Sequence, residues 1–425
     1  MSKKQDIVRG IGLFVLAMVV SALFWSFLPG EFRSNQSTDY LNHYEPVARS
    51  IAAGQGVTLN GTIATRYPPG FSILLAGVFR LGEWLNVEAN VMLLAFRLFC
   101  VGLSVVFVYA LARLIWSSNL SLIPALAWLT YPFALWLNKQ PNSEVPFIPI
   151  LYAGLFVFWF AILRKPRAWW LYFLAGMLAG AAMLIRPSAV GLGGVMAALA
   201  LVTGGHGKAL RARVLAALLL LTGNVLMVLP WEAAVFAQTR EVIPLSSGGT
   251  ITIQDGLTFL AVPKAYRREV DIPEDVAALM LEFQARRSEM GTMGEVLTVT
   301  IDEARQAPVA FAKLMLIKTA RSWYGIDSRQ FELPTILLQI VYLGLVLWGS
   351  LYAIRRGGDL RLLIGGNWII VLYFWAMTIL VIPLFRYMLP VMGLVMIALP
   401  GVWLSLKTRR AGRVVSVTRP YQSDY

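Results

Sequence analysis

The sequence predicts an all-α protein that crosses a membrane many times. Hydrophobic residues make up 58% of its 425 residues, only 14% are charged, and the mean hydropathy is +0.66, whereas a soluble domain has about 25% charged residues. Ten apolar runs are long enough to cross a hydrocarbon core about 30 Å thick. They fall near residues 10–28, 91–112, 120–137, 145–163, 168–185, 187–203, 214–231, 334–354, 362–384 and 387–406.

The basic residues predict which loops face the cytoplasm. The chain has 37 Lys and Arg against 23 Asp and Glu. With ten spans and a cytoplasmic N-terminus, the cytoplasmic segments hold eighteen basic and three acidic residues. The rest of the chain holds nineteen basic and twenty acidic residues. The excess positive charge therefore indicates topology, as the positive-inside rule describes, and not a nucleic-acid partner. Both termini are expected in the cytoplasm.

The first apolar run and the cysteine content indicate where the protein resides. Lys3, Lys4 and Arg9 precede the first run as in a signal peptide, but no small-residue cleavage pattern follows, so a retained helix is expected. The one cysteine, Cys100, excludes an intrachain disulfide. With the short cytoplasmic loops, these features favour a bacterial inner membrane, with the functional loops on the periplasmic side.

One further apolar run is too short to span. Residues 71–79 lie between Arg66 and Arg80, so this segment is expected to form a re-entrant or interfacial half-helix opened by Pro68-Pro69-Gly70. Counting it as a span would reverse every later loop and place the basic C-terminal tail outside.

The spans and loops predict three parts of the chain. Residues 1–230 form an N-terminal transmembrane module whose first outer loop is 29–90. Residues 231–333 form a second outer region, in which an amphipathic stretch at 308–325 is expected to lie in the membrane interface. Residues 334–425 contain the last spans and a basic cytoplasmic tail.

A helix is expected in the first outer loop from Thr38, a good N-cap, to a C-cap at Gly54. Pro46 would loosen its middle. The apolar stripe of this helix would consist of Leu41, Tyr44, Val47 or Ala48, and Ile51.

Two polar residues of this helix have both an ordinary and a functional interpretation. Asp39 falls in the first turn, where an acid either complements the helix dipole or forms part of a site. His43 follows four residues later and could share the face of Asp39. With no further His or Cys nearby, hydrogen bonding is favoured over metal binding. No cofactor is required, and a divalent metal is left open.

Other charged residues are predicted at the same outer face. Glu144 opens the fourth span, as a first-turn residue or as part of a site. The cations of this face are Arg66, Lys139, Arg186, Arg240 and Arg386. Arg186 and Arg386 could equally snorkel to lipid phosphates. Carboxylates beside guanidinium groups suit transfer to a hydroxyl or amine from a lipid-borne phosphate, because a base takes the proton while cations stabilise the departing phosphate.

The order of these segments resembles the GT-C membrane glycosyltransferases, the group that includes protein O-mannosyltransferases and lipid A aminoarabinose transferases. "DYLNHYEPVARSIAAGQGVTLNGTIATRYPPGFSILLAGVFRLGE" is similar to their first periplasmic loop. "NSEVPF", "IRPSAV", the segment from "PWEAAVF" to "ITIQDG", and "FRYMLPVMG" follow in the family's order. The resemblance covers about residues 30–400 and implies a GT-C fold with juxtamembrane helices in the first outer loop.

The resemblance also implies an activity and roles for residues. It implies inverting transfer from a polyprenyl-phosphate sugar to a lipid, glycan or protein acceptor at the outer face, among membrane lipids. Asp39 would be the catalytic base and Glu144 a second acid, with Arg66 and Arg386 as contacts to the donor phosphate. The further residues implied to bind donor or substrate are Tyr67, His43, Lys139, Arg186, Arg240 and Tyr387.

The chain departs from the family pattern at two places, and two other functions remain open. Tyr40 stands where members often have Glu, which leaves a metal role open. Ala234-Val235 stands where members often have Arg-Asn, which leaves open whether Arg240 supplies the missing charge. A lipid-linked sugar flippase or transporter would place charges within the spans, but these spans are almost free of charge, Arg97 being the exception. A polysaccharide polymerase or ligase would share the lipid-phosphate donor.

Overall fold

A computed structural model describes residues 3–33, 37–203, 209–259, 272–326 and 331–411. The chain divides into two compact units, each described here by itself. Unit 1 comprises Met1–Leu245, Leu345–Ile370 and Met392–Tyr425, and unit 2 comprises Ser246–Gly344 and Val371–Val391. The predicted division at residues 230 and 333 stays a prediction.

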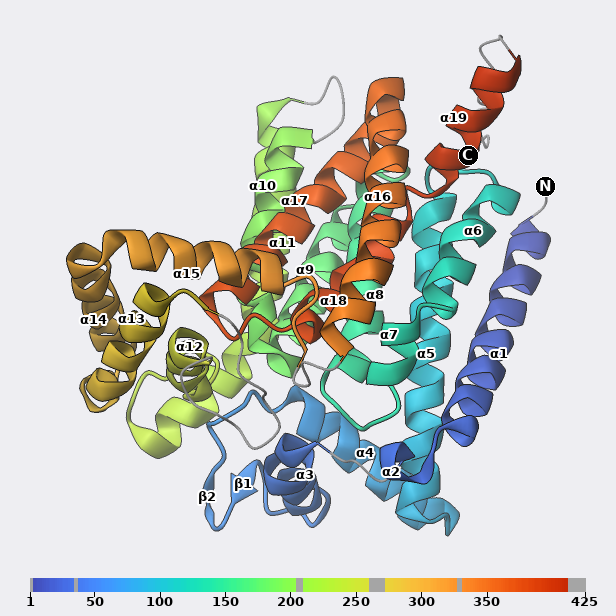
Figure 1. The fold of residues 1–425 in the computed structure, drawn as a ribbon. Helices are drawn as coiled ribbons and strands as arrows, with labels where there is room; N and C mark the ends of the chain where they lie inside the picture. The colour runs from blue at the N-terminus through green and yellow to red at the C-terminus, as the bar shows by residue number, and fades with distance from the viewer. Residues whose placement is uncertain (1–2, 34–36, 204–208, 260–271, 327–330, 412–425) are drawn as a thin grey trace. The chain divides into compact units, whose positions relative to one another are not determined.

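The elements are helices apart from one short β-ribbon (Figure 1). Up to the end of the first stretch of unit 1 they are α1 (Lys3–Phe27), α2 (Gly30–Arg33), the π-helix η1 (Tyr40–Tyr44), α3 (Glu45–Ala52), β1 (Thr58–Leu59), β2 (Thr62–Ile63), α4 (Gly70–Leu85), α5 (Ala89–Arg113), α6 (Ser118–Leu129), α7 (Pro132–Leu137), α8 (Glu144–Leu163), α9 (Trp169–Ile185), the 3-10 helix η2 (Pro187–Ala189), α10 (Leu192–Thr203) and α11 (Leu210–Thr239). The later elements are α12 (Gly248–Thr258), α13 (Glu274–Ala285), η3 (Arg286–Glu289), α14 (Met293–Gln306), α15 (Pro308–Arg321), α16 (Glu332–Arg356), α17 (Gly358–Leu380), α18 (Phe385–Met396) and α19 (Pro400–Ala411).

The predicted all-α membrane class is confirmed. Six helices of the described chain are long and apolar enough to cross a membrane, and the bent pair α18–α19 gives up to seven. Three shorter apolar helices lie at 118–129, 169–185 and 187–203. Each of the ten predicted apolar runs overlaps one of these segments, although the run at 120–137 is divided between α6 and α7. The count of ten crossings stays a prediction.

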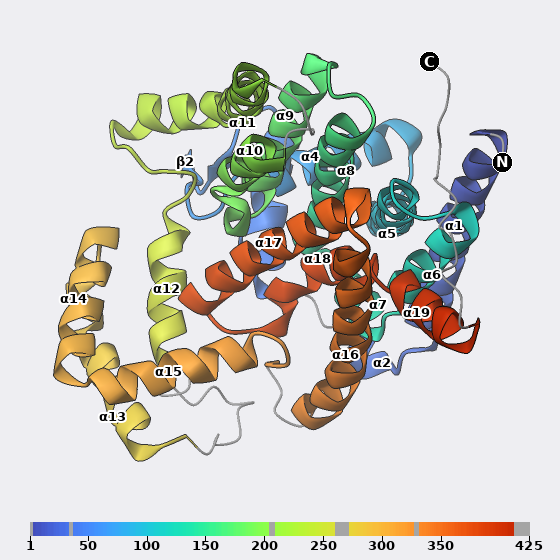
Figure 2. The ribbon, with the colours of Figure 1, turned by 90° about the horizontal axis from the view of Figure 1, so that it is seen from above.

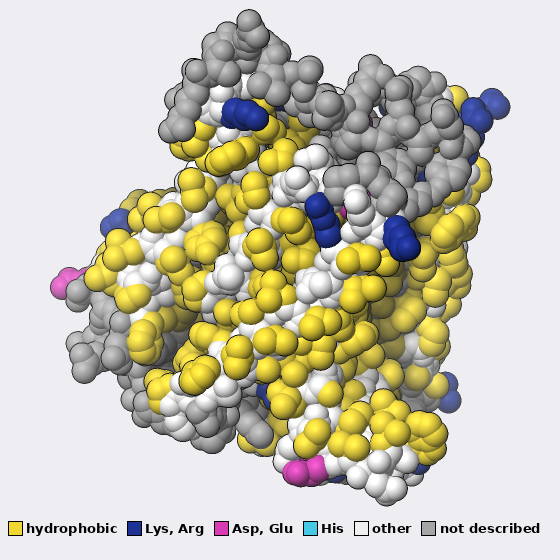
Figure 3. All heavy atoms as spheres, turned by 90° about the vertical axis from the view of Figure 1, so that its right-hand side faces the viewer, with side chains coloured by type: hydrophobic (Ala, Val, Ile, Leu, Met, Phe, Trp, Pro, Cys, Tyr) yellow, Lys and Arg dark blue, Asp and Glu magenta, His cyan; other side chains and the backbone are white. Residues whose placement is uncertain are grey.

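The outer surface of α1 is apolar, as a lipid-facing helix requires. Large hydrophobic side chains are exposed along its length, from Ile11 at 60% to Phe27 at 81%. Figure 3 shows a face of the protein on which hydrophobic side chains form a broad area with few charges. An aqueous surface of this kind would be an aggregation site, so the exposed apolar area supports a membrane environment.

Small residues let the helices of unit 1 pack closely. At Gly180 of α9, a Cβ atom would lie 2.7 Å from the carbonyl oxygen of Asn224 in α11, and at Gly176 it would overlap the carbonyl of Leu220. Glycines four residues apart bring two membrane helices into backbone contact. They fix α9, whose end carries Arg186, against α11.

The first outer helix begins at Thr38, with the Leu41 amide bonded to the Ser37 carbonyl at 3.1 Å. The loosening expected at Pro46 takes the form of the π-turn η1, which lies just before Pro46, a residue with no amide proton to continue the α-helical pattern. Tyr44, Val47 and Ala48 of the expected apolar stripe are buried. Leu41, expected in the buried stripe, is 46% exposed. Gly54, with φ 79°, follows the helix end as expected.

The segment at 71–79 forms part of α4, which is 16 residues long and does not meet the length of a spanning helix. Pro69 caps it, and its first residue, Gly70, lies against the end of α9, where a Cβ would be 2.6 Å from the Leu184 carbonyl oxygen. The Pro-Pro-Gly sequence thus starts α4 directly beside Arg186. In Figure 1, α2, α3 and α4 lie at one end of α1, and the turn between α16 and α17 lies at the other end.

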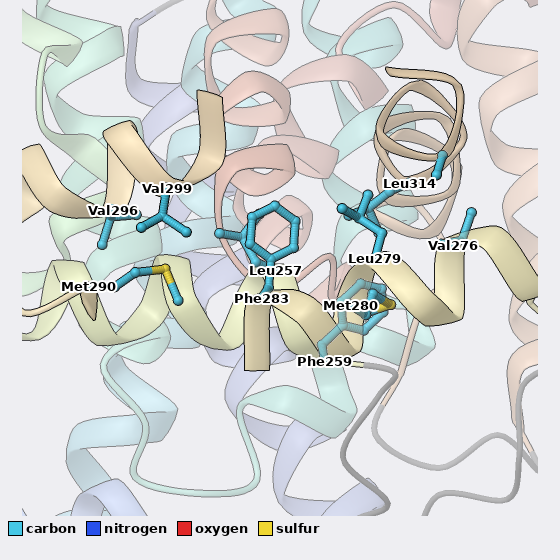
Figure 4. Packing of buried hydrophobic residues seen from close by; sticks show 11 residues of the cluster. Leu257, Phe259, Val276, Leu279, Met280, Phe283, Met290, Val296, Val299 and Leu314 are labelled. Carbon is cyan, nitrogen blue, oxygen red and sulfur yellow. The ribbon is translucent and has the colours of Figure 1, made fainter. Parts of the chain in front are cut away.

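Unit 2 has its own apolar core. Helices α12 to α15 lie side by side in Figures 1 and 2, and Figure 4 shows their buried side chains meeting. The core residues are Leu257, Phe259, Val276, Leu279, Met280, Phe283, Met290, Val296, Val299, Ala310 and Leu314. The helix expected within 308–325 corresponds to α15, in which Lys318 and Arg321 are buried at 1% and 6% exposure. Its position in the membrane interface stays a prediction.

Candidate functional site

The half-buried carboxylate of Asp39 accepts a hydrogen bond from the hydroxyl of Tyr67, with Oη and Oδ1 3.0 Å apart. Asp39 stands one residue before η1, and Tyr67 stands directly before the Pro-Pro pair that leads into α4. Two predicted site residues, 28 positions apart in the sequence, are therefore in direct contact.

Aromatic rings from η1 hold the ring of Tyr67. Tyr44 stacks on it with centroids 5.0 Å apart and an interplanar angle of 27°, and His43 meets it edge-on at 4.9 Å. His43 is 6% exposed. Burial, with the nearby charge of Arg66, lowers the pKa of the His43 imidazole to about 4, and the smaller effect of Asp39 opposes this. His43 is therefore neutral at physiological pH.

Arg66 supplies the positive charge of this group. Its side chain is exposed, its guanidinium carbon lies 5.6 Å from the centre of the Tyr67 ring, and it also contacts the Tyr67 hydroxyl through a hydrogen bond. Burial, followed by the charge of Asp39, raises the pKa of Tyr67 to about 12. The hydroxyl thus stays protonated and can donate to Asp39 while accepting from Arg66.

Glu144 and Arg186 form a buried ion pair with Oε1 and Nη1 2.6 Å apart. The two residues are 3% and 7% exposed. The backbone of Arg186 is extended and lies between α9 and η2. Arg186 Nη1 also donates to Ser143 Oγ at 3.1 Å. A carboxylate held in this way would leave Arg186 unbalanced if it took up a proton. The expected catalytic role of Glu144 stays a prediction.

Tyr44 connects the two carboxylate groups. Its hydroxyl is hydrogen-bonded to Ser143, and its ring meets Phe71 of α4 edge-on at 4.9 Å. Burial raises the pKa of Tyr44, with the positive charge of Arg186 acting in the opposite direction. Sequence reasoning treated Tyr44 as an apolar stripe residue and did not consider Ser143. The only sequence signal was the position of Ser143 before Glu144.

Lys139 is engaged with the backbone and with aromatic rings. Its Nζ donates to the carbonyl of Phe32 at 2.7 Å and lies 3.7 Å from the centre of the Trp136 ring. Burial lowers the pKa of Lys139. Its carbonyl accepts a hydrogen bond from Arg97. These contacts join the chain after α1 to the chain after α7, which is a structural use of the ammonium group.

Arg240 closes α11 in a left-handed conformation with φ 59°, and its amide donates to the Phe236 carbonyl at 2.9 Å. Its side chain is exposed. The structure therefore gives Arg240 a helix-terminating position, and its expected role toward a donor stays a prediction.

Arg386 and Tyr387 belong to unit 2 and start α18. The Arg386 guanidinium carbon lies 5.0 Å from the centre of the Tyr387 ring, and Nη2 approaches the Tyr387 hydroxyl at 3.4 Å. The amide of the preceding Phe385 donates to the Gly325 carbonyl at 2.7 Å. Within unit 2, the predicted Arg-Tyr pair thus lies beside the end of α15, and its role toward a phosphate stays a prediction.

Within the described ranges, no group of three or more His, Cys, Asp or Glu is placed to hold a metal ion. At position 40, where the family pattern often has a second acid, the Tyr40 side chain is 2% exposed and hydrogen-bonded to Glu45. The open prediction of a divalent metal therefore gains no ligand set from these residues.

Part of this site lies within a segment that matches a known family. Residues 66–232 match the family described as dolichyl-phosphate-mannose-protein mannosyltransferase. The matched segment begins at Arg66 and includes Glu144 and Arg186. No curated protein matches the chain.

The chain is similar to solved structures of membrane glycosyltransferases. The oligosaccharyltransferase AglB of Archaeoglobus fulgidus, in complex with an inhibitory peptide and a dolichol-phosphate, superimposes with a TM-score of 0.56 and 13% identity over 94% of this chain and 50% of AglB. The apo form of the Archaeoglobus fulgidus oligosaccharyltransferase gives a TM-score of 0.54 and 12% identity, over 96% of this chain and 52% of that chain. ArnT from Cupriavidus metallidurans, bound to undecaprenyl phosphate, gives a TM-score of 0.42 and 14% identity, over 96% of this chain and 80% of ArnT. This chain spans about half the length of the oligosaccharyltransferases.

Proposed function

We propose, on the premise that this chain has the GT-C fold of membrane glycosyltransferases, that it transfers a sugar from a polyprenyl-phosphate donor to an acceptor with inversion at the anomeric carbon. The match to a dolichyl-phosphate-mannose transferase family and the dolichol-phosphate of AglB support a lipid-phosphate donor. The acceptor class, whether lipid, glycan or protein, stays open, and the site is proposed to face the periplasm.

The contact between Asp39 and Tyr67 is the observation that carries this proposal. A general base needs a carboxylate that a substrate can reach and that is held in one orientation. Asp39 is half-buried and held at Oδ1 by the Tyr67 hydroxyl. The exposed cation of Arg66 contacts that same hydroxyl. Glu144, in contrast, is buried against Arg186.

The reaction would be a single displacement. The Asp39 carboxylate takes the proton of an acceptor hydroxyl or amine, and the acceptor atom forms a bond to the anomeric carbon of the sugar. The bond between that carbon and the phosphate oxygen breaks, and the polyprenyl phosphate leaves with the electron pair. Arg66 would stabilise the negative charge that develops on the phosphate. One base suffices for inversion, which leaves Glu144 as a supporting residue.

The base is tested by Asp39→Asn, which keeps size and hydrogen bonding. Membranes that contain the protein would be given a panel of radiolabelled polyprenyl-phosphate sugars, and transfer of label out of the lipid fraction would be measured. We expect a loss of about 100-fold or more, the range by which a general base contributes. The control is Asp359→Asn, which removes a carboxylate paired with Arg164 at 3.0 Å. Near-normal transfer by Asp39→Asn would overturn the assignment.

The donor phosphate contact is tested by binding. Purified protein in detergent would be titrated with the same labelled sugar lipids, and retained label would be measured for wild type, Arg66→Ala and Arg80→Ala. Both arginines are exposed, and Arg80 lies on the exposed side of α4. Loss of a charged hydrogen bond weakens binding about tenfold or more, so we expect that loss only for Arg66→Ala. If wild type retains no labelled lipid, the proposal of a polyprenyl-phosphate sugar donor is refuted.

A further inference from the structure

The π-turn η1 directs two consecutive side chains toward the same partner. In a regular helix, successive side chains point about 100° apart, but His43 and Tyr44 are both buried, at 6% and 6% exposure, and both contact the Tyr67 ring. π-Turns of this kind occur frequently at functional sites. The turn therefore builds a clamp that consists of His43 and Tyr44 and holds Tyr67.

The clamp is itself fixed to the helices of unit 1. The Tyr44 carbonyl accepts a hydrogen bond from Ser72 Oγ of α4 at 3.2 Å. Its hydroxyl is bonded to Ser143, which in turn accepts from Arg186 at 3.1 Å. The ring of Tyr67 is therefore positioned by α4, by the start of α8 and by the end of α9 through Tyr44.

The single proton of the Tyr67 hydroxyl is used within the protein. It donates to Asp39 Oδ1 at 3.0 Å and accepts from Arg66. A phenol has one proton to donate, and that proton is directed at the carboxylate. The family resemblance implies that Tyr67 binds donor or substrate, but this geometry gives it a different task.

We infer that Tyr67 is a positioning residue that fixes the Asp39 carboxylate relative to Arg66, and that it does not bind the donor itself. This inference rests on the proposed function, in which Asp39 is the base and Arg66 meets the phosphate. The ring clamp sets the place of the hydroxyl, and the hydroxyl sets the orientation of the carboxylate. Misplacement of a catalytic group by about 1 Å can lower a rate about 100-fold.

The test is Tyr67→Phe, which keeps the ring in the clamp and removes only the hydroxyl. The control is Tyr40→Phe, because Tyr40 is also buried in η1 but its hydroxyl is bonded to Glu45 and not to Asp39. We expect Tyr67→Phe to lower kcat about 10- to 100-fold. We expect the Kd of Tyr67→Phe for the labelled sugar lipid to change less than threefold, and this retained binding also shows that the variant is folded. We expect Tyr40→Phe to keep kcat near wild type.

Three outcomes would overturn the inference. A weakened Kd with an unchanged kcat would make Tyr67 a donor contact. An equal loss of kcat in Tyr40→Phe would show a general effect of removing a buried hydroxyl. A normal kcat in Tyr67→Phe, with Asp39→Asn inactive, would refute the positioning role alone. An active Asp39→Asn would instead refute the proposed function.

Discussion

The start of α4 offers a sharp test of how the site is assembled. Gly70→Ala adds one Cβ atom, which would lie 2.6 Å from the carbonyl oxygen and 2.8 Å from the carbonyl carbon of Leu184. Both are backbone atoms at the end of α9, so no side-chain rotation can relieve the contact. To reach an ordinary distance of 3.4 Å, α4 must move about 0.8 Å away from α9.

This displacement has a cost in both stability and activity. Overpacking of this kind destabilises a protein by about 1–3 kcal/mol. Tyr67 stands three residues before Gly70, so the same movement shifts its hydroxyl relative to Asp39. A shift approaching 1 Å in a catalytic group can cost about 100-fold in rate. We therefore expect both a lower melting temperature and a large loss of transfer.

Gly77→Ala is the matched control in the same helix. Gly77 is exposed, and a Cβ there would meet nothing within 4 Å. Alanine is favoured over glycine in a helix by about 1 kcal/mol, so this variant should be as stable as wild type or more stable. The assay is thermal unfolding in detergent followed by tryptophan fluorescence, with label transfer in parallel. If Gly70→Ala melts at or above Gly77→Ala, the proposed close contact is wrong.

Two further predictions concern buried charge. Burial lowers the pKa of His43 from 6.5 to about 4, so unfolding takes up a proton between these values. Stability should fall by up to about 3 kcal/mol as the pH drops from 6.5 to 4. His43→Phe should flatten this slope in melting curves, and an unchanged slope would contradict the assignment. Because Glu144 and Arg186 form a buried pair, Glu144→Gln or Arg186→Met alone should cost about 3–5 kcal/mol. The double variant should recover part of that loss, whereas additive losses would show that the two residues act independently.

The sequence determined the class of this protein because hydrophobic length and charge placement follow local rules. Runs of apolar residues specify membrane helices wherever they occur, and the helices lie where the runs predicted them. The expected half-helix at 71–79 could be recognised for the same reason, since its length and the Pro-Pro-Gly start are written in adjacent residues. The family order of motifs then indicated a GT-C fold.

The contacts that make a site of these residues were decided by the tertiary structure. Asp39 and Tyr67 meet because the first outer helix packs on α4, where Ser72 donates to the Tyr44 carbonyl. Helix periodicity predicted the burial of Tyr44, Val47 and Ala48, whereas Leu41 of the same predicted stripe is exposed. Glu144 is paired with Arg186 because α9 ends at Arg186 beside it. Hydrogen bonds and ion pairs depend on distances of a few ångström between segments far apart in the chain, and no local pattern encodes such distances.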